Sequence, residues 1–370
     1  MTASSRDRWR LIDTGLRPAA ENIAINRAML DAHQEGLIPH TLRFLRFQPS
    51  ALVGFHQSVE QELRADYCAA HGIAIQRRIT GGGAIYFDET QIGWELYLHR
   101  RVLGTADMQE ISRSICEMAA AGMRRLGVDA QFRPRNDIEV NGRKISGTGG
   151  AFEGDSIMYQ GTLLIDFDIE KMLRVLRIPV EKLSDKAIAS ARERVANLKD
   201  LLGVAPERET VMRSLAQSFA EGFGVEFEPV ATMSGPEQEK FIQALAEIDH
   251  PDWINLVSRP LTDAPILEGL YKADGGLMRV ALAVDKPANR IKQAWFTGDF
   301  FVNPKRMIVD LEAALHDSSL TAYRHTVNEF FRRYPVEMLR LRPEDFSQTI
   351  ENALTSLSAK PVSMAEGAAS

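Results

Sequence analysis

Apolar and polar residues alternate along this chain with two different periods. In residues 93–99, Trp94, Leu96 and Leu98 alternate with more polar side chains, which is the period of a strand. In residues 18–34, small and apolar residues recur three or four positions apart, which is the period of a helix. Similar patterns predict helices at 60–71, 107–126, 169–176 and 206–223, and strands at 41–47, 51–53, 73–78 and 84–87.

The chain changes character near residue 250, where His250-Pro251, Arg259-Pro260 and Ala264-Pro265 punctuate it as in a linker. Beyond that point we expect strands at 266–272, 277–284 and 290–296. Asn303-Pro304 is then expected to begin a helix, with Pro304 at its first position, and a second helix is expected at 321–331. The predicted organisation is a large domain (1–250), a linker (251–265), a small β-β-β-α-α domain (266–355) and a flexible tail (356–370).

Strands and helices follow one another without regular βαβ alternation, which favours an α+β fold over a doubly wound sheet. The 370 residues carry a net charge of −6, and a duplex DNA partner would favour a basic protein. No apolar run approaches the ~18 residues of a membrane span, and the N-terminus lacks the apolar core of a signal peptide. We therefore expect a cytoplasmic protein with no nucleic-acid or membrane partner.

Cysteine and histidine give no sign of a metal site in the sequence. The two cysteines, Cys68 and Cys116, are too widely spaced for a ligand pattern or a disulfide framework. The eight histidines fall singly, and none pairs at the helical spacing of metal ligands.

The segment from Arg77 to Ala84 contains three consecutive glycines after an expected strand. Glycines let backbone amides approach a ligand closely, and such amides form a concave anion site. Arg77 and Arg78 could grip a phosphate or carboxylate from two sides. The alternative is a plain hairpin turn with solvated arginines.

A second segment, residues 135–148, contains Asn141-Gly142, a strong signal for a two-residue hairpin turn. Counting outward from that turn pairs residue 140 with 143, 139 with 144, 138 with 145 and 137 with 146. Asp137, Glu139, Lys144 and Ser146 then share one face. Such a face suits a nucleotide phosphate and its metal ion. The alternative is a cross-strand ion pair between Glu139 and Lys144.

Together these segments resemble lipoate–protein ligases. The resemblance is carried by residues 77–88 (RRITGGGAIYFD), by RND at 135–137 with RKISG at 143–147, by QGTLL at 160–164 and by the segment 182–198. It covers residues 9–225 and extends through Gly298-Asp299-Phe300-Phe301 into a C-terminal accessory domain.

The resemblance implies a large mixed-sheet catalytic domain of the biotin and lipoate ligase type, related to class II aminoacyl-tRNA synthetases. It also implies activation of lipoate or octanoate by ATP and Mg²⁺ through an acyl-adenylate intermediate. The acyl group then passes to a lysine of a lipoyl domain or an H-protein-like acceptor.

The same resemblance assigns roles to individual residues. Lys144 is the expected catalytic residue, Asp137 is the expected Mg²⁺ ligand, and Val53, Gly54 and Phe55 are expected to line the lipoyl pocket. The loop 182–198 is expected to order over the adenylate. The residues expected to bind ATP and the adenylate are Arg78, Thr80, Gly81, Gly82, Gly83, Ala84, Asn136, Asp137, Gly147, Gly161, Thr162 and Lys186.

Two positions depart from the family pattern, since Phe87 and Gln160 stand where histidine is usual. Three alternatives remain. An octanoyl transferase would use a cysteine nucleophile and a carrier thioester without ATP, but no cysteine follows Gly147 in the hairpin segment. A biotin ligase lacks support because its glycine- and arginine-rich segment is absent. A non-catalytic protein that binds lipoyl groups or small ligands is the third.

Overall fold

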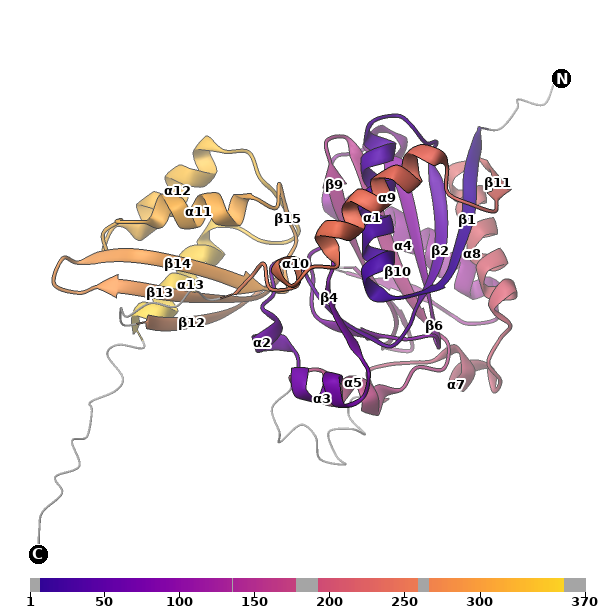
Figure 1. The fold of residues 1–370 in the computed structure, drawn as a ribbon, viewed down its shortest axis with the longest axis horizontal. Coiled ribbons are helices and arrows are strands. Elements are labelled where there is room, and N and C mark those ends of the chain that lie inside the picture. Colours follow the sequence, from indigo (N-terminus) through magenta and orange to yellow (C-terminus); the bar gives the residue numbers. More distant parts are fainter. Residues whose placement is uncertain (1–6, 135, 178–191, 259–265, 356–370) are drawn as a thin grey trace, which may run out of the picture. The chain divides into compact units, whose positions relative to one another are not determined.

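The computed structural model describes residues 7–134, 136–177, 192–258 and 266–355. The chain divides into two compact units, residues 1–258 and residues 259–370. The fold is α+β, with a large mixed sheet in the first unit and a smaller second unit (Figure 1).

An eight-stranded sheet forms the centre of the first unit. Its order is β11 (Glu226–Val230), β1 (Arg8–Arg17), β2 (Thr41–Phe47), β6 (Gln91–His99), β10 (Ser156–Leu164), β9 (Arg143–Glu153), β8 (Asp137–Val140) and β7 (Gln131–Arg133). Strand β1 pairs in parallel with both of its neighbours, β11 and β2, whereas all other neighbouring strands pair antiparallel. The sheet is therefore mixed, as expected.

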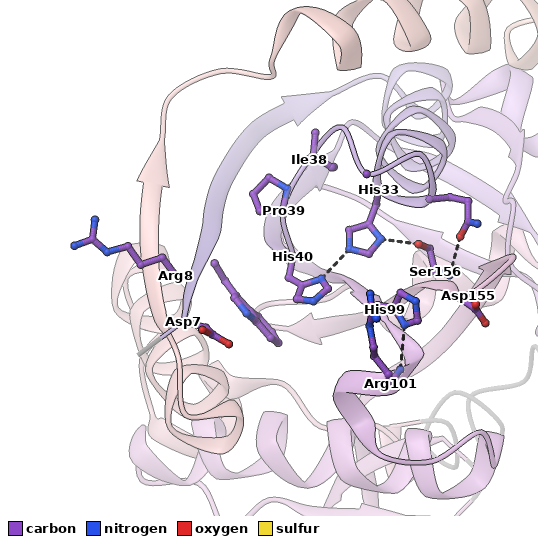
Figure 2. Close-up of a pocket in the computed structure, with 13 residues that line it drawn as sticks. Asp7, Arg8, His33, Ile38, Pro39, His40, His99, Arg101, Asp155 and Ser156 are labelled. Carbon is purple, nitrogen blue, oxygen red and sulfur yellow. Dashed lines mark hydrogen bonds between the residues drawn. The ribbon is translucent and has the colours of Figure 1, made fainter. Parts of the chain in front are cut away.

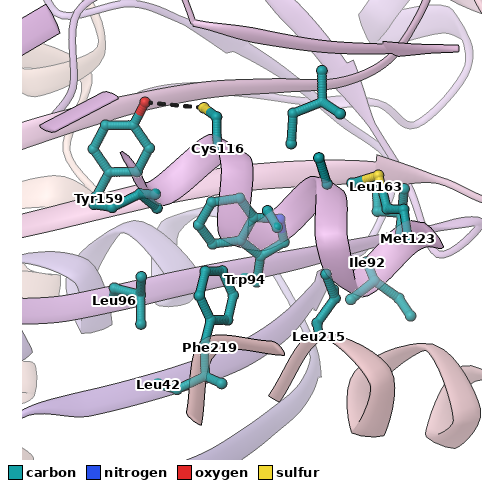
Figure 3. Close-up of a cluster of buried hydrophobic side chains, with 14 of the residues drawn as sticks. Leu42, Ile92, Trp94, Leu96, Cys116, Met123, Tyr159, Leu163, Leu215 and Phe219 are labelled. Carbon is teal, nitrogen blue, oxygen red and sulfur yellow. Dashed lines mark hydrogen bonds between the residues drawn. The ribbon is translucent and has the colours of Figure 1, made fainter. Parts of the chain in front are cut away.

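Helices cover both faces of this sheet (Figure 1). On one face, α1 (Ala19–Gln34) and α9 (Gly235–Ile248) pack over Tyr97 and Met158. On the other face, α4 (Met108–Arg125) and α8 (Arg208–Phe223) pack over Trp94, Leu96 and their neighbours (Figure 3). Residues 93–99 thus form the predicted strand, and this strand is buried on both faces. Among the described residues, no helix is both long and apolar enough to cross a membrane.

The polar side of β6 is buried beneath α1 rather than exposed. Glu95 accepts hydrogen bonds from Asn26 of α1 at 2.6 Å and from Arg43 of β2 at 2.9 Å. Tyr97 also donates to Glu95 at 2.7 Å, and Arg43 reaches Asn22 at 2.6 Å. A buried charge is tolerated when it is paired and hydrogen-bonded, so this network lets a carboxylate lie under a helix.

A smaller sheet of β4 (Ala74–Arg77), β3 (Ser50–Val53) and β5 (Ile85–Phe87) lies in the same unit. The helix expected at 60–71 is broken, because buried Leu63 between two short helices bridges to Leu176 instead. The remaining short elements are α2 (Val59–Glu62), α3 (Ala65–Ala70), η1 (Arg100–Leu103), α5 (Ile169–Val175) and α7 (Leu198–Leu202).

The predicted linker begins later than residue 251. Pro251–Ile254 forms a short helix, α10, and its Trp253 is buried in the core of the first unit. The proline that suggested a linker instead occupies the first turn of this helix, where a missing N–H costs nothing.

The second unit packs three helices on a three-stranded antiparallel sheet. The strands are β12 (Ile266–Ala273), β13 (Gly276–Asp285) and β14 (Arg290–Gly298), and the helices are α11 (Met307–Leu315), α12 (Tyr323–Arg333) and α13 (Pro343–Thr355).

Two features of the second unit differ from the predicted β-β-β-α-α order. Asn303 does not cap a helix but pairs with Glu337, in a short ladder of β15 (Val302–Asn303) with β16 (Glu337–Met338), and α11 begins at Met307. The third helix, α13, was not predicted. The expected tail, 356–370, lies outside the described residues.

A buried ion pair joins β1 to the start of α9. Arg10 donates to both carboxylate oxygens of Glu237, which also caps the helix by accepting from Ser234. Burial alone would raise the pKa of Glu237, but the hydrogen bonds from Arg10 and Ser234 outweigh burial and leave that pKa below its ordinary value. The folded state therefore favours the ionised carboxylate.

Replacing Glu237 with Gln should lower the free energy of unfolding by about 3 kcal/mol at pH 7, because it leaves Arg10 buried without a counter-charge. The stabilisation from a depressed pKa is present above the unfolded pKa and is lost as pH falls. The difference between the two proteins should therefore shrink below about pH 4. Urea denaturation at several pH values measures it. Glu21→Gln, which breaks the half-buried surface pair with Arg17, should cost less than about 1 kcal/mol.

Candidate functional site

The glycine triplet lies in the loop between β4 and β5, directly against the segment that follows β3. Phe55 N–H donates to Thr80 O at 2.8 Å, and Arg78 N–H donates to Val53 O at 2.9 Å. A Cβ on Gly54 would lie 1.9 Å from Gly82 O. The structure thus brings the expected lipoyl-pocket residues 53–55 into contact with the expected adenylate residues 80–83, and only glycine fits at position 54.

Arg78 is a buried cation within this loop. Its Nη2 donates to Gly83 O at 2.6 Å and to Gly81 O at 3.3 Å, while its Nε has no hydrogen-bond partner among the described residues. Burial lowers the pKa of Arg78 to about 10, so the guanidinium is still charged at neutral pH. A buried donor left without an acceptor costs free energy, which a bound anion would offset.

Arg77 does not form the second half of an anion grip. Its side chain is fully buried, and its guanidinium donates to the backbone oxygens of residues 54, 55, 57, 253 and 254. These carbonyl oxygens accept hydrogen bonds from every nitrogen of the guanidinium, so Arg77 has none left for a ligand. Of the two arginines that were expected to hold a ligand, Arg78 is therefore the candidate. Arg77 instead ties the 54–57 segment and α10 to β4.

The second predicted segment is a β-hairpin, formed by β8 and β9. Asn141 and Gly142 both have positive φ, 51° and 75°, as its two-residue turn requires. Residue 140 pairs with 143 and 139 with 144, as predicted. The outer two predicted pairs are wrong, because a bulge shifts the register and pairs Ile138 with Ser146 and Asp137 with Gly147. Ser146 is consequently buried and leaves the expected polar face.

The bulge brings Lys144 to Asp137 rather than to Glu139. Lys144 Nζ lies 2.7 Å from Asp137 Oδ1, and Arg133 of β7 lies 2.9 Å from Asp137 Oδ2. Glu139 pairs with Arg133 at 3.2 Å. The Lys144 side chain remains 41% exposed, so its ammonium is held in place yet accessible to a ligand.

Several other expected ligand residues gather around this pair. A Cβ on Gly147 would lie 2.9 Å from Lys144 Nζ, and Gly147 N–H donates to Thr162 Oγ1 at 3.4 Å. Gly161 has a packing reason to be glycine, since a Cβ there would lie 2.2 Å from the Trp94 ring. Asn136 uses its amide to bind Thr148 O.

Part of the expected lid segment lies beside Lys144. Lys144 N–H donates to Arg194 O at 2.8 Å, and Ala196 N–H donates to Lys144 O at 2.9 Å. Lys186 and most of the loop 182–198 lie outside the described residues. The described end of that loop is therefore tied to the backbone of the expected catalytic lysine.

Gln160, one of the two departures from the family pattern, links the two halves of the site. Its Nε2 donates to Thr80 Oγ1 at 3.2 Å, which joins β10 to the glycine loop. Phe87, the other departure, is buried in the core with its ring centroid 4.7 Å from that of Phe47. An apolar residue at position 87 is thus explained by its surroundings.

The described part of the chain has no group of three or more His, Cys, Asp or Glu side chains that could hold a metal ion. Three of the histidines, however, line a cleft of about 580 Å³ where β6 ends and β10 begins (Figure 2). His33 Nε2 lies 2.8 Å from His40 Nδ1. Burial, followed by the charges of His40 and His99, lowers the pKa of His33 to about 4, so His33 is neutral at pH 7. Lys144 lies near the start of β9, whose other end, Glu153, pairs with Ser156 beside this cleft.

The comparisons with known proteins agree on a family. The lipoyl protein ligase A/B catalytic domain matches residues 18–220. This chain belongs to that family. An octanoyltransferase LipM from Kyrpidia tusciae is 30% identical over 269 residues, covering 66% of this chain and 97% of the relative.

Two solved structures of this lipoyl ligase family share the fold. A bipartite lipoate protein ligase from Thermoplasma acidophilum, studied with its E2 lipoyl domain, has a TM-score of 0.59 and 26% identity, covering 69% of this chain and all of that one. A lipoate-protein ligase A bound with ATP has a TM-score of 0.57 and 26% identity, covering 67% and 98%. The family therefore contains both ligases and octanoyltransferases.

Two residues that shape the site were missed from the sequence. Arg133 binds Asp137 across the β7–β8 ladder, and Thr148 binds Asn136. Both lie within 12 positions of their partners, but only the register of three strands brings them together.

Gly54→Ala should destabilise the protein by about 2 kcal/mol, because the new methyl group would overlap Gly82 O and force the glycine loop to move. Chemical denaturation measures the change. Gly235→Ala is the matched control, since nothing lies within 4 Å of a Cβ there, and it should leave stability within about 0.5 kcal/mol of the parent. Equal stability of the two variants would contradict the close contact of the loops.

Proposed function

We propose that this protein is an ATP-dependent lipoate–protein ligase. In the first step a carboxylate oxygen of lipoate or octanoate attacks the α-phosphorus of ATP, and pyrophosphate leaves. In the second step a lysine amine of a lipoyl-domain or H-protein-like acceptor attacks the acyl carbon, and AMP leaves. The chain's similarity to a ligase bound with ATP and to a ligase studied with its lipoyl domain supports both halves of the proposal.

The buried, incompletely bonded Arg78 is the observation that carries this proposal. It lies in a loop of backbone amides that touches the segment 53–55. Carboxylate and phosphate repel one another, so a fixed cation where they meet lowers the barrier to their reaction. Arg78 and the glycines would hold that junction, and residues 53–55 would hold the adjoining part of the acyl chain.

Lys144 would supply the second cation. Its ion pair with Asp137 orients the ammonium before substrates arrive, and an oriented charge stabilises a transition state without first having to reorganise. The ammonium would contact the acyl oxygen and the α-phosphate in both steps. Asn136, bonded to Thr148, would hold the start of β8, where Asp137 lies, rather than offer its amide to the nucleotide.

The proposal includes Mg²⁺, which offsets the negative charge of the triphosphate when bound. Asp137 is the carboxylate of the described hairpin closest to Lys144, and both of its oxygens already accept ion pairs. It would therefore contribute one ligand at most, and the nucleotide phosphates would provide the others. Mg²⁺ usually keeps several waters and binds through one or two carboxylates plus phosphates.

The rival within the family is acyl transfer from a carrier thioester, which requires an accessible thiolate. The sequence has two cysteines, and both are fully buried. Burial raises the pKa of Cys68 and of Cys116, so neither thiol ionises readily at neutral pH. Reaction of a buried neutral thiol with a bulky thioester is unfavourable, which favours activation by ATP.

The proposal is tested by incubating the purified protein with a lipoyl domain, lipoate, ATP and Mg²⁺. Intact-mass spectrometry should show one lipoyl adduct that disappears when ATP is omitted. A parallel reaction contains octanoyl-carrier thioester without ATP. If the thioester alone modifies the lipoyl domain as fast as the complete mixture, the protein is an octanoyltransferase and the ligase proposal fails.

Lys144→Ala should lower the rate of lipoyl transfer at least about 100-fold, because it removes a charge that acts in the transition state. The thermal midpoint should change little, since the side chain is exposed in a surface ion pair. Lys199→Ala, which breaks the exposed pair with Asp166, is the matched control and should keep full activity. Full activity of Lys144→Ala would exclude its catalytic role.

A further inference from the structure

A chain of buried hydroxyl groups connects α4 to the hairpin that carries Lys144. Tyr159 Oη of β10 lies 2.7 Å from Ser112 Oγ of α4 and 2.8 Å from Thr148 Oγ1 of β9. Thr148 Oγ1 in turn donates to Asn136 O at 2.7 Å. Cys116 Sγ lies beside this chain, 3.6 Å from Tyr159 Oη (Figure 3). It also lies 3.4 Å from Thr148 Oγ1.

The direction of these hydrogen bonds is fixed by their last acceptor. A carbonyl oxygen only accepts, so the single proton of Thr148 goes to Asn136 O. Tyr159 must therefore donate its proton to Thr148, and Ser112 must donate to Tyr159. Burial raises the pKa of Tyr159, so its phenol keeps the proton that this direction needs.

The chain ends on the peptide that sets the position of Asp137. Thr148 binds Asn136 three times: its N–H donates to Asn136 O at 3.0 Å, its hydroxyl donates to the same oxygen, and its carbonyl accepts from the Asn136 amide. Asp137 follows directly and holds Lys144 Nζ at 2.7 Å. A shift of the Asn136 peptide would therefore move the carboxylate that orients the ammonium.

We propose that Tyr159 is a positioning residue, which acts through Thr148 and Asn136 to hold the Asp137–Lys144 pair in its reactive place. This inference rests on the proposed function, because the pair matters only if Lys144 acts on the acyl and phosphoryl groups. The Tyr159 ring also packs near Trp94, with ring centroids 6.4 Å apart. Tyr159→Phe keeps that packing and removes the hydroxyl alone.

Four variants separate positioning from stability. Tyr159→Phe and Thr148→Val each interrupt the hydroxyl chain with little change of side-chain volume. Thr148→Ser keeps the hydroxyl and should leave the chain of hydrogen bonds intact. Ser214→Ala is the matched control. Ser214 is a buried hydroxyl that donates to Gly122 O of the same helix α4 at 2.7 Å, but it belongs to α8 and not to this chain of hydroxyls.

Two readouts are measured for each variant beside its thermal midpoint. The first is kcat and KM for acyl transfer to the lipoyl domain, with whichever acyl donor supports the reaction. Tyr159→Phe and Thr148→Val should lower kcat about tenfold with KM nearly unchanged, as expected when a hydrogen bond that orders the transition state is lost. The second is hydrogen exchange of the residue 148 amide, which should become faster in both variants.

The control decides how these results are read. Thr148→Ser and Ser214→Ala should match the parent in kcat and in exchange at residue 148. If Tyr159→Phe and Thr148→Val resemble Ser214→Ala in both readouts, the hydroxyl chain is only part of the core and the inference is overturned. If the parent protein shows no ATP-dependent transfer, the proposed function fails, but this result does not decide the inference. Hydrogen exchange at residue 148, together with kcat measured with the thioester donor, then still tests the positioning role of Tyr159.

Discussion

The buried guanidinium of Arg77 is the interaction on which the arrangement of the site depends. A charge taken out of water must find hydrogen-bond acceptors, and Arg77 finds them in the backbone carbonyls of two segments far apart in sequence, 54–57 and 253–254. Those bonds hold the 54–57 segment against β4, which puts Gly54 on Gly82. Because Arg77 is used in this way, its neighbour Arg78 is the arginine that stays with the glycine loop.

The different roles of Arg77 and Arg78 show which features could be predicted from the sequence and which could not. Arg77 and Arg78 are identical in type, and carbonyls up to 177 residues away decide which one is structural. The Asn141-Gly142 turn and the two pairs nearest to it were predictable because local geometry sets them. The bulge was not, because β9 must also pair with β10 and with residues 194–196. Strands β2 and β6 and helices α1, α4 and α8 followed from their periodicity, whereas β1, β11, α9 and the polar network under α1 did not.

The two halves of the site contribute cations in different electrostatic settings. Arg78 is buried, and among the described residues it bonds only to carbonyl dipoles and lacks one acceptor. Lys144 is partly exposed, and Asp137 neutralises its charge. The opposite charges of the neighbouring Arg133 and Glu139 also cancel. An entering anion therefore gains most at Arg78, and Lys144 can exchange a carboxylate for a phosphate with little net change in charge. Gln160 of β10 joins the sheet that carries Lys144 to the glycine loop through Thr80.

The same scaffold serves ligases and octanoyltransferases, so the fold cannot decide which reaction occurs. What differs chemically is the group that attacks or activates the acyl carbonyl. A thiolate needs an exposed, electropositive position, whereas Cys116 lies in the core among Ser112, Thr148 and Tyr159 hydroxyls, where burial favours the neutral thiol. The proposed function, by contrast, places Arg78 and Lys144 at the junction of a carboxylate and a phosphate. The positions of these residues, more than the names of the relatives, therefore favour a reaction that uses ATP.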